Sequence, residues 1–305
     1  MLSTRCLLLF SLAACCGSAV SVARPQAPAG ENRTISLNRY WNFVTDPAGG
    51  LKVNDLASVE KVRQALVPGS WQSEFDDLRD YAGVAWYWTS FTLAPLAAGQ
   101  IALVRFGAVD YRAEVYFNGQ KAGSREGGYL PFEFDATSLL HPGENQLAVR
   151  VVDPGAKPDE VAGIKYAEIP HGKQNWYVQT SGLWQGVEIE VKARLHLGAV
   201  HITARADGSF RIEAPYVNAG GNPMGEPAKM SAQILDSGGK VVWERSIELM
   251  PLVGLNRRLW PDHGKCEFPG RISNPSLWSP ASPALYTLRV GLSSGDTQVT
   301  RFGWG

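Results

Sequence analysis

Residues 112–124, RAEVYFNGQKAGS, hold the feature that decides the fold. Asn118 and Gly119 stand between two extended runs, and this dipeptide suits a type I′ turn, in which both central residues take positive φ. The first run alternates apolar and polar side chains, as a strand with one buried face does. This stretch therefore predicts a β-hairpin, and the residues around it continue the same pattern.

Strand-like runs with a period of two lie on both sides of this hairpin. They are bounded by Gly, Pro, Asn or Asp, and HPGEN at 141–145 forms a second clear turn. The runs are WYWTSFTL, QIALVRFGAV, GYLPFEFDAT, NQLAVRVVD and GVEIEV. Residues 53–65 differ, because their valines and leucine recur at three-residue steps, and they predict a short helix.

Length and composition favour two domains made of short strands. A chain of 305 residues gives a prior of two domains of about 100–200 residues each. The 32 Gly and 19 Pro, with ten Trp, ten Tyr and eleven Phe, suit strands joined by tight turns. Near residues 191–200 the strands become shorter and the hairpins simpler. We predict an all-β chain with a jelly-roll sandwich over residues 31–193 and an immunoglobulin-like sandwich over residues 194–305.

The N-terminal segment reads as an export signal. Arg5 precedes an apolar run that is too short to span a bilayer, and small residues follow up to Ala23. We predict a signal peptide over residues 1–23 and a Pro/Ala/Gly linker over residues 24–30. A second possibility is open, because LAAC resembles a bacterial lipobox that would leave Cys15 lipidated. In either case the chain is exported, and it meets a membrane only through that lipid anchor.

The remaining composition argues against several classes of function. Lys plus Arg equals Asp plus Glu at 29 each, so no field of one sign attracts nucleic acid, and we expect no nucleic-acid partner. Neither a phosphate-binding loop nor a serine-esterase elbow occurs. HGKC at 263–266 has no matching second pair, so we interpret it as a loop and expect neither a metal nor a cofactor. With three of the four cysteines in the leader, only Cys266 is left, and core burial must stabilise the fold.

Three consecutive aromatics raise the question of sugar binding. Trp86, Tyr87 and Trp88 occupy successive strand positions, so at least one must face away from the core. An outward aromatic can stack on a sugar ring, cover another domain or lie half exposed.

The last strand of the first domain places acidic residues on its outer side. Glu188 and Glu190 alternate with apolar residues, which is the pattern of a solvated sheet face rather than of a catalytic pair. Trp184 shares their side by the same count, and we predict that it contacts another domain rather than a sugar.

Eight stretches of the sequence, taken in chain order, carry a resemblance to a known family. They are LNRYWNFVTDP at 37–47, VPGSWQSEF at 67–75, YAGVAWYWTSFTL at 81–93, RFGAVDYRAEVYFNGQKAGSREGGYLPFEFDAT at 105–137, NQLAVRVVDP at 145–154, HGKQNWYVQTSGLWQGVEIE at 171–190, NPSLWSPASPALYTL at 274–288 and RFGWG at 301–305. Together they resemble the non-catalytic N-terminal half of glycoside hydrolase family two, the β-galactosidase, β-glucuronidase and β-mannosidase group. The resemblance implies a galactose-binding-like jelly roll, an immunoglobulin-like domain and then a (β/α)₈ barrel, with RFGWG similar to the strand that leads into that barrel.

The resemblance also bears on catalysis. In the family both catalytic residues are glutamates on barrel strands, the first usually preceded by Asn, and the dipeptide Asn-Glu does not occur here. We therefore expect no catalytic residue in this chain and no hydrolysis by the chain alone. Loops of the family's first domain help to shape the sugar pocket. On matching positions, the candidates for contact with sugar hydroxyls are Asp80, Tyr81, Lys173, Gln174, Asn175 and the neighbouring Trp176; the alternative for each polar one is an internal hydrogen bond that closes its loop.

These observations lead to one expected function and two alternatives. We expect the non-catalytic, sugar-binding part of an exported family-two enzyme that hydrolyses terminal β-glycosides such as β-galactosides or β-glucuronides. Its partners would be a carbohydrate and a missing or separate catalytic barrel, and the chain would be a fragment or truncated at its gene. The alternatives are a free-standing carbohydrate-binding module at the cell surface and a protein-interaction sandwich.

Overall fold

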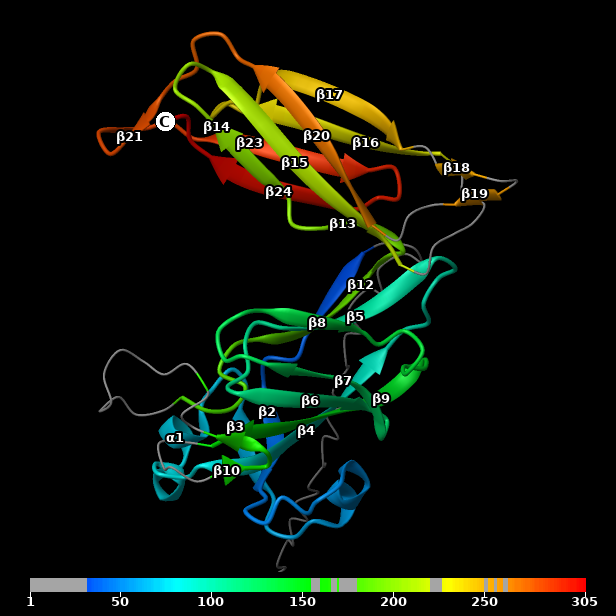
Figure 1. Ribbon diagram of the computed structural model, residues 1–305, viewed down its shortest axis with the longest axis vertical. Coiled ribbons are helices and arrows are strands. Elements are labelled where there is room, and N and C mark those ends of the chain that lie inside the picture. The colour runs from blue at the N-terminus through cyan, green and yellow to red at the C-terminus, as the bar shows by residue number, and fades with distance from the viewer. Residues whose placement is uncertain are drawn as a thin grey trace, which may run out of the picture.

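The computed structural model describes residues 32–154, 160–165, 169, 180–219, 227–249, 252–254, 257–259 and 263–305. Two successive β-sandwiches follow one another along the chain, as predicted, and they meet at a narrow waist (Figure 1). The expected signal peptide, the linker and Cys15 lie outside the described residues. No helix in the described part of the chain is long and apolar enough to cross a membrane.

The first sandwich pairs a six-stranded sheet with a four-stranded one. The six-stranded sheet has the order β3 (Arg63–Leu66), β2 (Tyr40–Thr45), β4 (Gly83–Leu93), β9 (Gly143–Asp153), β6 (Arg112–Phe117) and β7 (Gln120–Glu126). The four-stranded sheet has the order β1 (Arg33–Ser36), β12 (Val187–Ala193), β5 (Gln100–Phe106) and β8 (Phe132–Asp135). Short elements accompany them: η1 (Val53–Ser58), α1 (Trp71–Glu74), η2 (Asp76–Leu78) and the hairpin of β10 (Glu160–Val161) with β11 (Ile164–Lys165).

The hairpin predicted from RAEVYFNGQKAGS is confirmed. Strands β6 and β7 pair antiparallel across Asn118 and Gly119, whose φ angles are 49° and 82°. Positive φ at both positions is what the two-residue turn requires, and Asn and Gly adopt it at little cost.

Apolar residues that alternate along the strands form the core between these two sheets. The burial of large aromatics dominates it, at about 1.5–3 kcal/mol for each fully buried side chain. The largest members are Trp41, Phe43, Trp71, Tyr87, Phe106 and Phe117.

The three consecutive aromatics of β4 are all buried. Tyr87 points into the main core, whereas Trp86 and Trp88 point to the opposite face, as the alternation requires. Leu56 of η1 closes over that face and forms a second apolar cluster with Trp86 and Trp88, which are only 1% and 7% exposed. The outward tryptophans therefore hold the 46–59 segment in place and offer no surface to a sugar.

The helix predicted over residues 53–65 is mostly wrong. A 3₁₀ turn covers only Val53–Ser58, and Arg63–Leu66 form strand β3 on the edge of the six-stranded sheet. Lys61 has φ of 59°, which breaks any helical continuation. The three-residue steps reflect packing on Trp86 and Trp88 rather than one helical face.

The second sandwich begins directly after β12. One sheet joins β13 (Leu195–Leu197) and β14 (His201–Ala204) to one edge of β15 (Ser209–Asn218) and β20 (His263–Arg271) to the other. The facing sheet has the order β17 (Val241–Leu249), β16 (Ala228–Leu235), β23 (Tyr286–Leu292) and β24 (Thr297–Phe302). Two short hairpins complete it: β18 (Leu252–Gly254) with β19 (Arg257–Leu259), and β21 (Trp278–Ser279) with β22 (Ser282–Pro283).

The RFGWG stretch takes part in this second core. Trp304 is fully buried, and the centroid of its ring lies between 5.5 and 5.8 Å from those of Phe302, Phe210 and Tyr286.

Cys266 also faces this core from β20. In the described ranges, no group of three or more His, Cys, Asp or Glu is arranged to hold a metal ion. HGKC at 263–266 forms the first part of β20, so the interpretation of it as a loop is wrong.

Candidate functional site

Asp80 and Tyr81 lie at one end of the first sandwich, between η2 and β4. Asp80 is exposed, so its carboxylate can reach a ligand. Tyr81 is half-buried, and its hydroxyl donates to Val84 O at 2.6 Å. Burial, followed by the charge of Asp46, raises the pKa of Tyr81 to about 12. The hydroxyl proton of Tyr81 is thus used in a hydrogen bond inside the domain. This favours the alternative in which Tyr81 closes its own loop rather than contacts a sugar.

Trp71 of α1 connects this corner to Gly182, in the segment that leads into β12. Its Nε1 donates to Tyr81 O at 3.2 Å, and the two rings meet edge to face with centroids 5.8 Å apart. A Cβ on Gly182 would lie 3.3 Å from the Trp71 ring and 2.4 Å from the Tyr87 hydroxyl. Gly182 has φ of 99°, so glycine is required here both for space and for backbone conformation.

Lys173, Gln174, Asn175 and Trp176 lie outside the described residues. The chain just after them is firmly held. Ser181 is 1% exposed, and its N–H donates to Gln72 Oε1 at 3.0 Å. Its hydroxyl oxygen accepts a hydrogen bond from Gln72 Nε2 at 2.5 Å. The same hydroxyl donates to Asp153 Oδ2 at 2.5 Å. Residues 180–182 are therefore fixed to α1 and to the end of β9.

Two buried carboxylates that the sequence analysis did not single out meet at this end. Asp153 ends β9 and is fully buried, and Asp110 precedes β6 and is 7% exposed. Asp110 and Gly182 exchange two backbone hydrogen bonds, at 2.9 and 3.1 Å. Burial, followed by the charge of Asp153, raises the pKa of Asp110 to about 7. A carboxyl that titrates near neutrality, bonded through its backbone to Gly182, can act as a hydrogen-bond donor or as an acceptor.

Among the described residues at this end, Tyr129 rather than Trp184 is an exposed aromatic. Trp184 is half-buried, its Nε1 donates to Gly128 O at 2.8 Å, and its ring meets Tyr129 edge to face at 6.1 Å. Tyr129 itself is 61% exposed. This hydrogen bond and this ring contact of Trp184 both lie within the first sandwich, so its contact with another domain stays a prediction.

The signal for Asp110 was present in the sequence. Its carboxylate interrupts an otherwise apolar run, FGAVDY, immediately before β6. Nothing in the sequence places Asp153 beside it, because the two residues are brought together only by the pairing of β6 with β9.

Two family models match the chain, in the order of its two sandwiches. Residues 35–161 match the sugar-binding domain of glycosyl hydrolases family 2, and residues 189–304 match a second model described as glycosyl hydrolases family 2. The predicted jelly-roll and immunoglobulin-like fold classes agree with these matches and with the observed sheets.

Similar proteins carry names from the same group. A beta-glucuronidase of Paenibacillus borealis is 27% identical over 281 residues, which are 86% of this chain and 43% of that protein. A beta-galactosidase of Priestia megaterium is 23% identical over 295 residues, which are 87% of this chain and 27% of that protein. A solved structure of Bifidobacterium dentium beta-glucuronidase has a TM-score of 0.64 and 26% identity, covering 92% of this chain and 49% of that one.

The chain thus spans less than half the length of each of these relatives. The two family models together account for both sandwiches, and the solved structure shares their fold. The chain belongs to glycosyl hydrolase family 2.

Proposed function

We propose that this chain is the non-catalytic sugar-binding and immunoglobulin-like portion of an exported family 2 enzyme. The full-length enzyme would hydrolyse terminal β-glycosides, with β-glucuronides and β-galactosides as the substrate classes. The names of the similar proteins, beta-glucuronidase and beta-galactosidase, support these classes, and the B. dentium beta-glucuronidase structure is a complex with coumarin-3-O-glucuronide. A separate catalytic barrel would supply the acid/base and the nucleophile.

The observation that carries this proposal is the organisation of one end of the first sandwich. Asp80 is exposed there, and residues 180–182, which follow the predicted sugar-facing loop, are fixed to α1 through Gln72. A rigid support of this kind holds polar groups in place before a ligand arrives, which lowers the entropic cost of binding. Asp80 and the residues 173–176 would then form a rim around a sugar whose scissile bond lies in the barrel.

The non-catalytic part of the proposal is tested with the purified 305-residue chain. It is incubated with nitrophenyl β-galactoside, β-glucuronide and β-mannoside, and the expected result is no release of nitrophenol above the blank. Turnover well above the blank would show that the chain itself holds a catalytic pair.

The rim is tested in the full-length enzyme with two carboxylate variants. Asp80→Ala should raise KM for the preferred aryl glycoside about tenfold, since hydrogen bonds to charged groups contribute about 1.5–3 kcal/mol. Glu144→Ala removes an exposed carboxylate at the opposite end of β9 and should leave KM unchanged. Equal effects of both substitutions, or no effect of Asp80→Ala, would remove Asp80 from the rim.

Export is tested in the native host by mass spectrometry of the mature N-terminus. Cleavage after Ala23 or a lipidated Cys15 supports export, and the variant Cys15→Ser separates the two routes because it abolishes only the second. A cytoplasmic chain that keeps Met1 would contradict this part of the proposal.

A further inference from the structure

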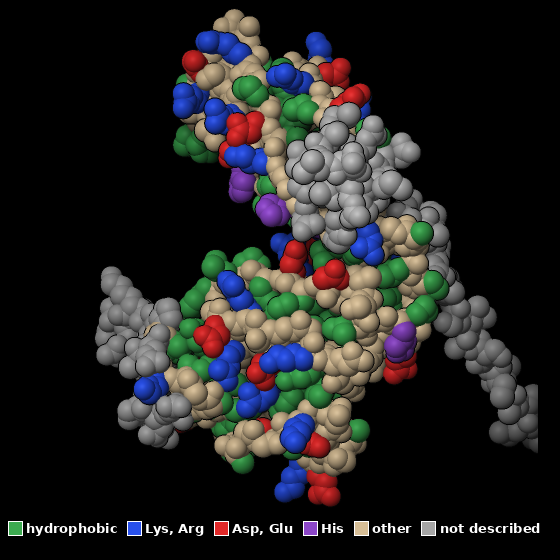
Figure 2. All heavy atoms as spheres, turned by 45° about the vertical axis from the view of Figure 1, so that its right-hand side comes forward, with side chains coloured by type: hydrophobic (Ala, Val, Ile, Leu, Met, Phe, Trp, Pro, Cys, Tyr) green, Lys and Arg blue, Asp and Glu red, His purple; other side chains and the backbone are tan. Residues whose placement is uncertain are grey.

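A polar groove crosses the outer face of the four-stranded sheet, at the waist between the sandwiches. Its larger part is a cleft of about 690 Å³ between the two domains. A second hollow of about 310 Å³ adjoins it, and Arg105 and Pro131 line both. Figure 2 shows the recess at the waist, with acidic and basic side chains on its first-domain side. Ligand sites commonly have volumes of about 300–1,000 Å³, so the groove is large enough for several sugar units.

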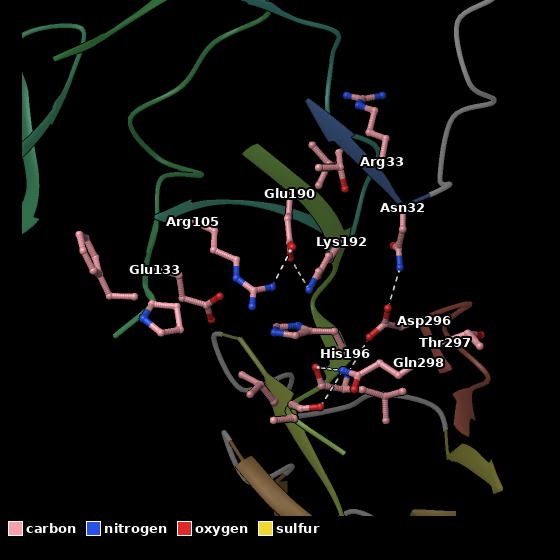
Figure 3. A pocket seen from close by; sticks show the side chains of 18 residues that line it. Asn32, Arg33, Arg105, Glu133, Glu190, Lys192, His196, Asp296, Thr297 and Gln298 are labelled. Atoms are coloured by element: carbon pink, nitrogen blue, oxygen red, sulfur yellow. Dashed lines mark hydrogen bonds and ion pairs between the residues drawn. The ribbon is translucent and has the colours of Figure 1, made fainter. Parts of the chain in front are cut away.

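One hydrogen bond between the domains and two within the second sandwich lie along one wall of this groove. Asn32 Nδ2 donates to Asp296 Oδ1 at 2.9 Å, and the other carboxylate oxygen of Asp296 accepts from Leu197 N at 2.6 Å. On the same wall, Gln298 Nε2 donates to Gly198 O at 2.7 Å. These bonds tie the start of β24 to β13 and, through Asn32, to the residue that precedes β1, so the second-domain wall of the cleft is attached to the first domain at this point (Figure 3).

A charged cluster forms the first-domain side of the groove. Glu190 lies at its centre, with its side chain 10% exposed, and pairs with Arg105 at 3.2 Å and with Lys192 at 2.5 Å. Figure 3 shows Arg105 and Lys192 approaching it from two sides. Burial would raise the pKa of Glu190, but the hydrogen bond and charge of Lys192, together with Arg105, outweigh it and hold the pKa below its usual value. The interpretation of Glu190 as part of a solvated face is therefore wrong.

The cluster still has capacity for a ligand. The Arg105 side chain is 46% exposed, and a guanidinium has five N–H donors of which Glu190 occupies one. Glu133 is exposed and lies opposite Arg105 in the β5–β8 pairing. Donors and acceptors thus alternate across the sheet, with Lys192 and Arg105 donating and Glu133 accepting.

The balance of charge decides which ligand suits this face. Glu133, Glu188 and Glu190 oppose Arg105 and Lys192, and Arg33, which also lines the cleft, donates to Ala94 O, so the sheet side of the groove is close to balanced in charge. A polyanion would meet three carboxylates among these cations. The hydroxyls of a neutral saccharide both donate and accept, so they match alternating carboxylates and cations without a charge penalty.

We propose that this groove binds a neutral oligosaccharide of two or more units, with Arg105 as its central donor and Glu133 as an acceptor. The site lies at the waist, beside β12, β5 and β8 (Figure 1), whereas Asp80 lies between η2 and β4, shortly after α1 in the chain. The proposal does not depend on a role for this chain in glycoside hydrolysis.

The test is isothermal titration of the full chain with four neutral tetrasaccharides: cellotetraose, xylotetraose, mannotetraose and β-1,4-galactotetraose. Tetragalacturonic acid serves as the acidic counterpart. At least one neutral tetrasaccharide is expected to bind with millimolar or tighter affinity, and more tightly than the acidic one. No heat from any neutral tetrasaccharide at millimolar concentration, or tighter binding of the acidic one, would overturn the proposal.

Variants locate the binding. Arg105→Ala should weaken it about tenfold, and the fold should survive because Lys192 continues to neutralise Glu190. Glu133→Gln, an exposed and isosteric change, should weaken it several-fold and provides the second readout if Arg105→Ala unfolds. Arg211→Ala is the matched control, since it removes an arginine from an ion pair with Glu267 on the exposed second sandwich and should leave affinity unchanged.

Asp80→Ala separates this proposal from the proposed function. It should leave tetrasaccharide affinity unchanged while it impairs the full-length enzyme. Unchanged binding in both Arg105→Ala and Glu133→Gln, or a loss of binding in Asp80→Ala, would place the saccharide elsewhere on the molecule.

Discussion

The hydroxyl of Ser181 donates to Asp153 Oδ2 at 2.5 Å, deep at the end of the first sandwich. Asp153 ends β9, and Ser181 belongs to the segment that leads into β12, so this bond ties that segment to the six-stranded sheet. Gln72 adds two further bonds to Ser181 from α1. The network thus connects three separate parts of the chain, one of which directly follows the predicted sugar-facing loop in the sequence.

Ser181→Ala should destabilise the protein by about 1–3 kcal/mol, because it leaves the buried carboxylate of Asp153 and the amide of Gln72 each without one partner. Urea denaturation followed by tryptophan fluorescence measures this free energy of unfolding. Ser124→Ala on the exposed edge strand β7 is the control and should change it by less than about 0.5 kcal/mol. Equal stabilities of the two variants would show that the network contributes nothing to the fold.

Leu56→Ala should destabilise the protein by about 2–5 kcal/mol, since it opens a cavity over Trp86 and Trp88. The tryptophan emission should also shift to longer wavelength, because water gains access to both indole rings. Leu66→Ala removes a leucine that is 42% exposed and should alter neither property. A Leu56→Ala protein with wild-type stability and emission would mean that the 46–59 segment does not cover these rings.

Gly128→Ala should destabilise the protein by about 1–3 kcal/mol through overpacking. A Cβ at this position would lie 2.4 Å from Asp110 Oδ1, so either the turn before Tyr129 or the carboxyl must move. Gly50→Ala is the matched control, because its Cβ would meet nothing within 4 Å. Thermal unfolding of the two variants measures the difference, and a Gly128→Ala protein as stable as Gly50→Ala would rule out the close contact.

Local patterns in the sequence were sufficient for most of the strands and for the order of the two sandwiches, but not for β3 or for the start of β20. Asn118 and Gly119 determine their turn through their own backbone preferences, so the hairpin could be predicted without any tertiary information. The same alternation showed that Trp86 and Trp88 leave the main core. It could not show what covers them, because Leu56 reaches them from a segment that is distant in the sequence.

The polar network and the groove depend on pairing between distant strands. Asp110 and Asp153 are 43 positions apart in the sequence, and only the register of β6 on β9 brings them together. The cluster at Glu190 similarly needs β5 beside β12. Period-two counting correctly placed Glu190 on the outer face, but it could not reveal that Arg105, Lys192 and the second sandwich enclose it.

Asp110→Asn should flatten the pH dependence of stability between about pH 4 and pH 7. Burial, followed by the charge of Asp153, raises the pKa of Asp110 to about 7 in the folded protein. The unfolded chain releases this proton near pH 4. Between these values the folded state binds more protons, so the wild-type free energy of unfolding should fall as the pH rises, by more than about 1 kcal/mol between pH 5 and pH 8. Urea denaturation at pH 5, 6, 7 and 8 measures this slope, which Glu144→Gln, an exposed carboxylate at the far end of β9, should leave as in the wild type. If the wild-type and Asp110→Asn curves ran parallel over this range, Asp110 would titrate as an ordinary carboxyl.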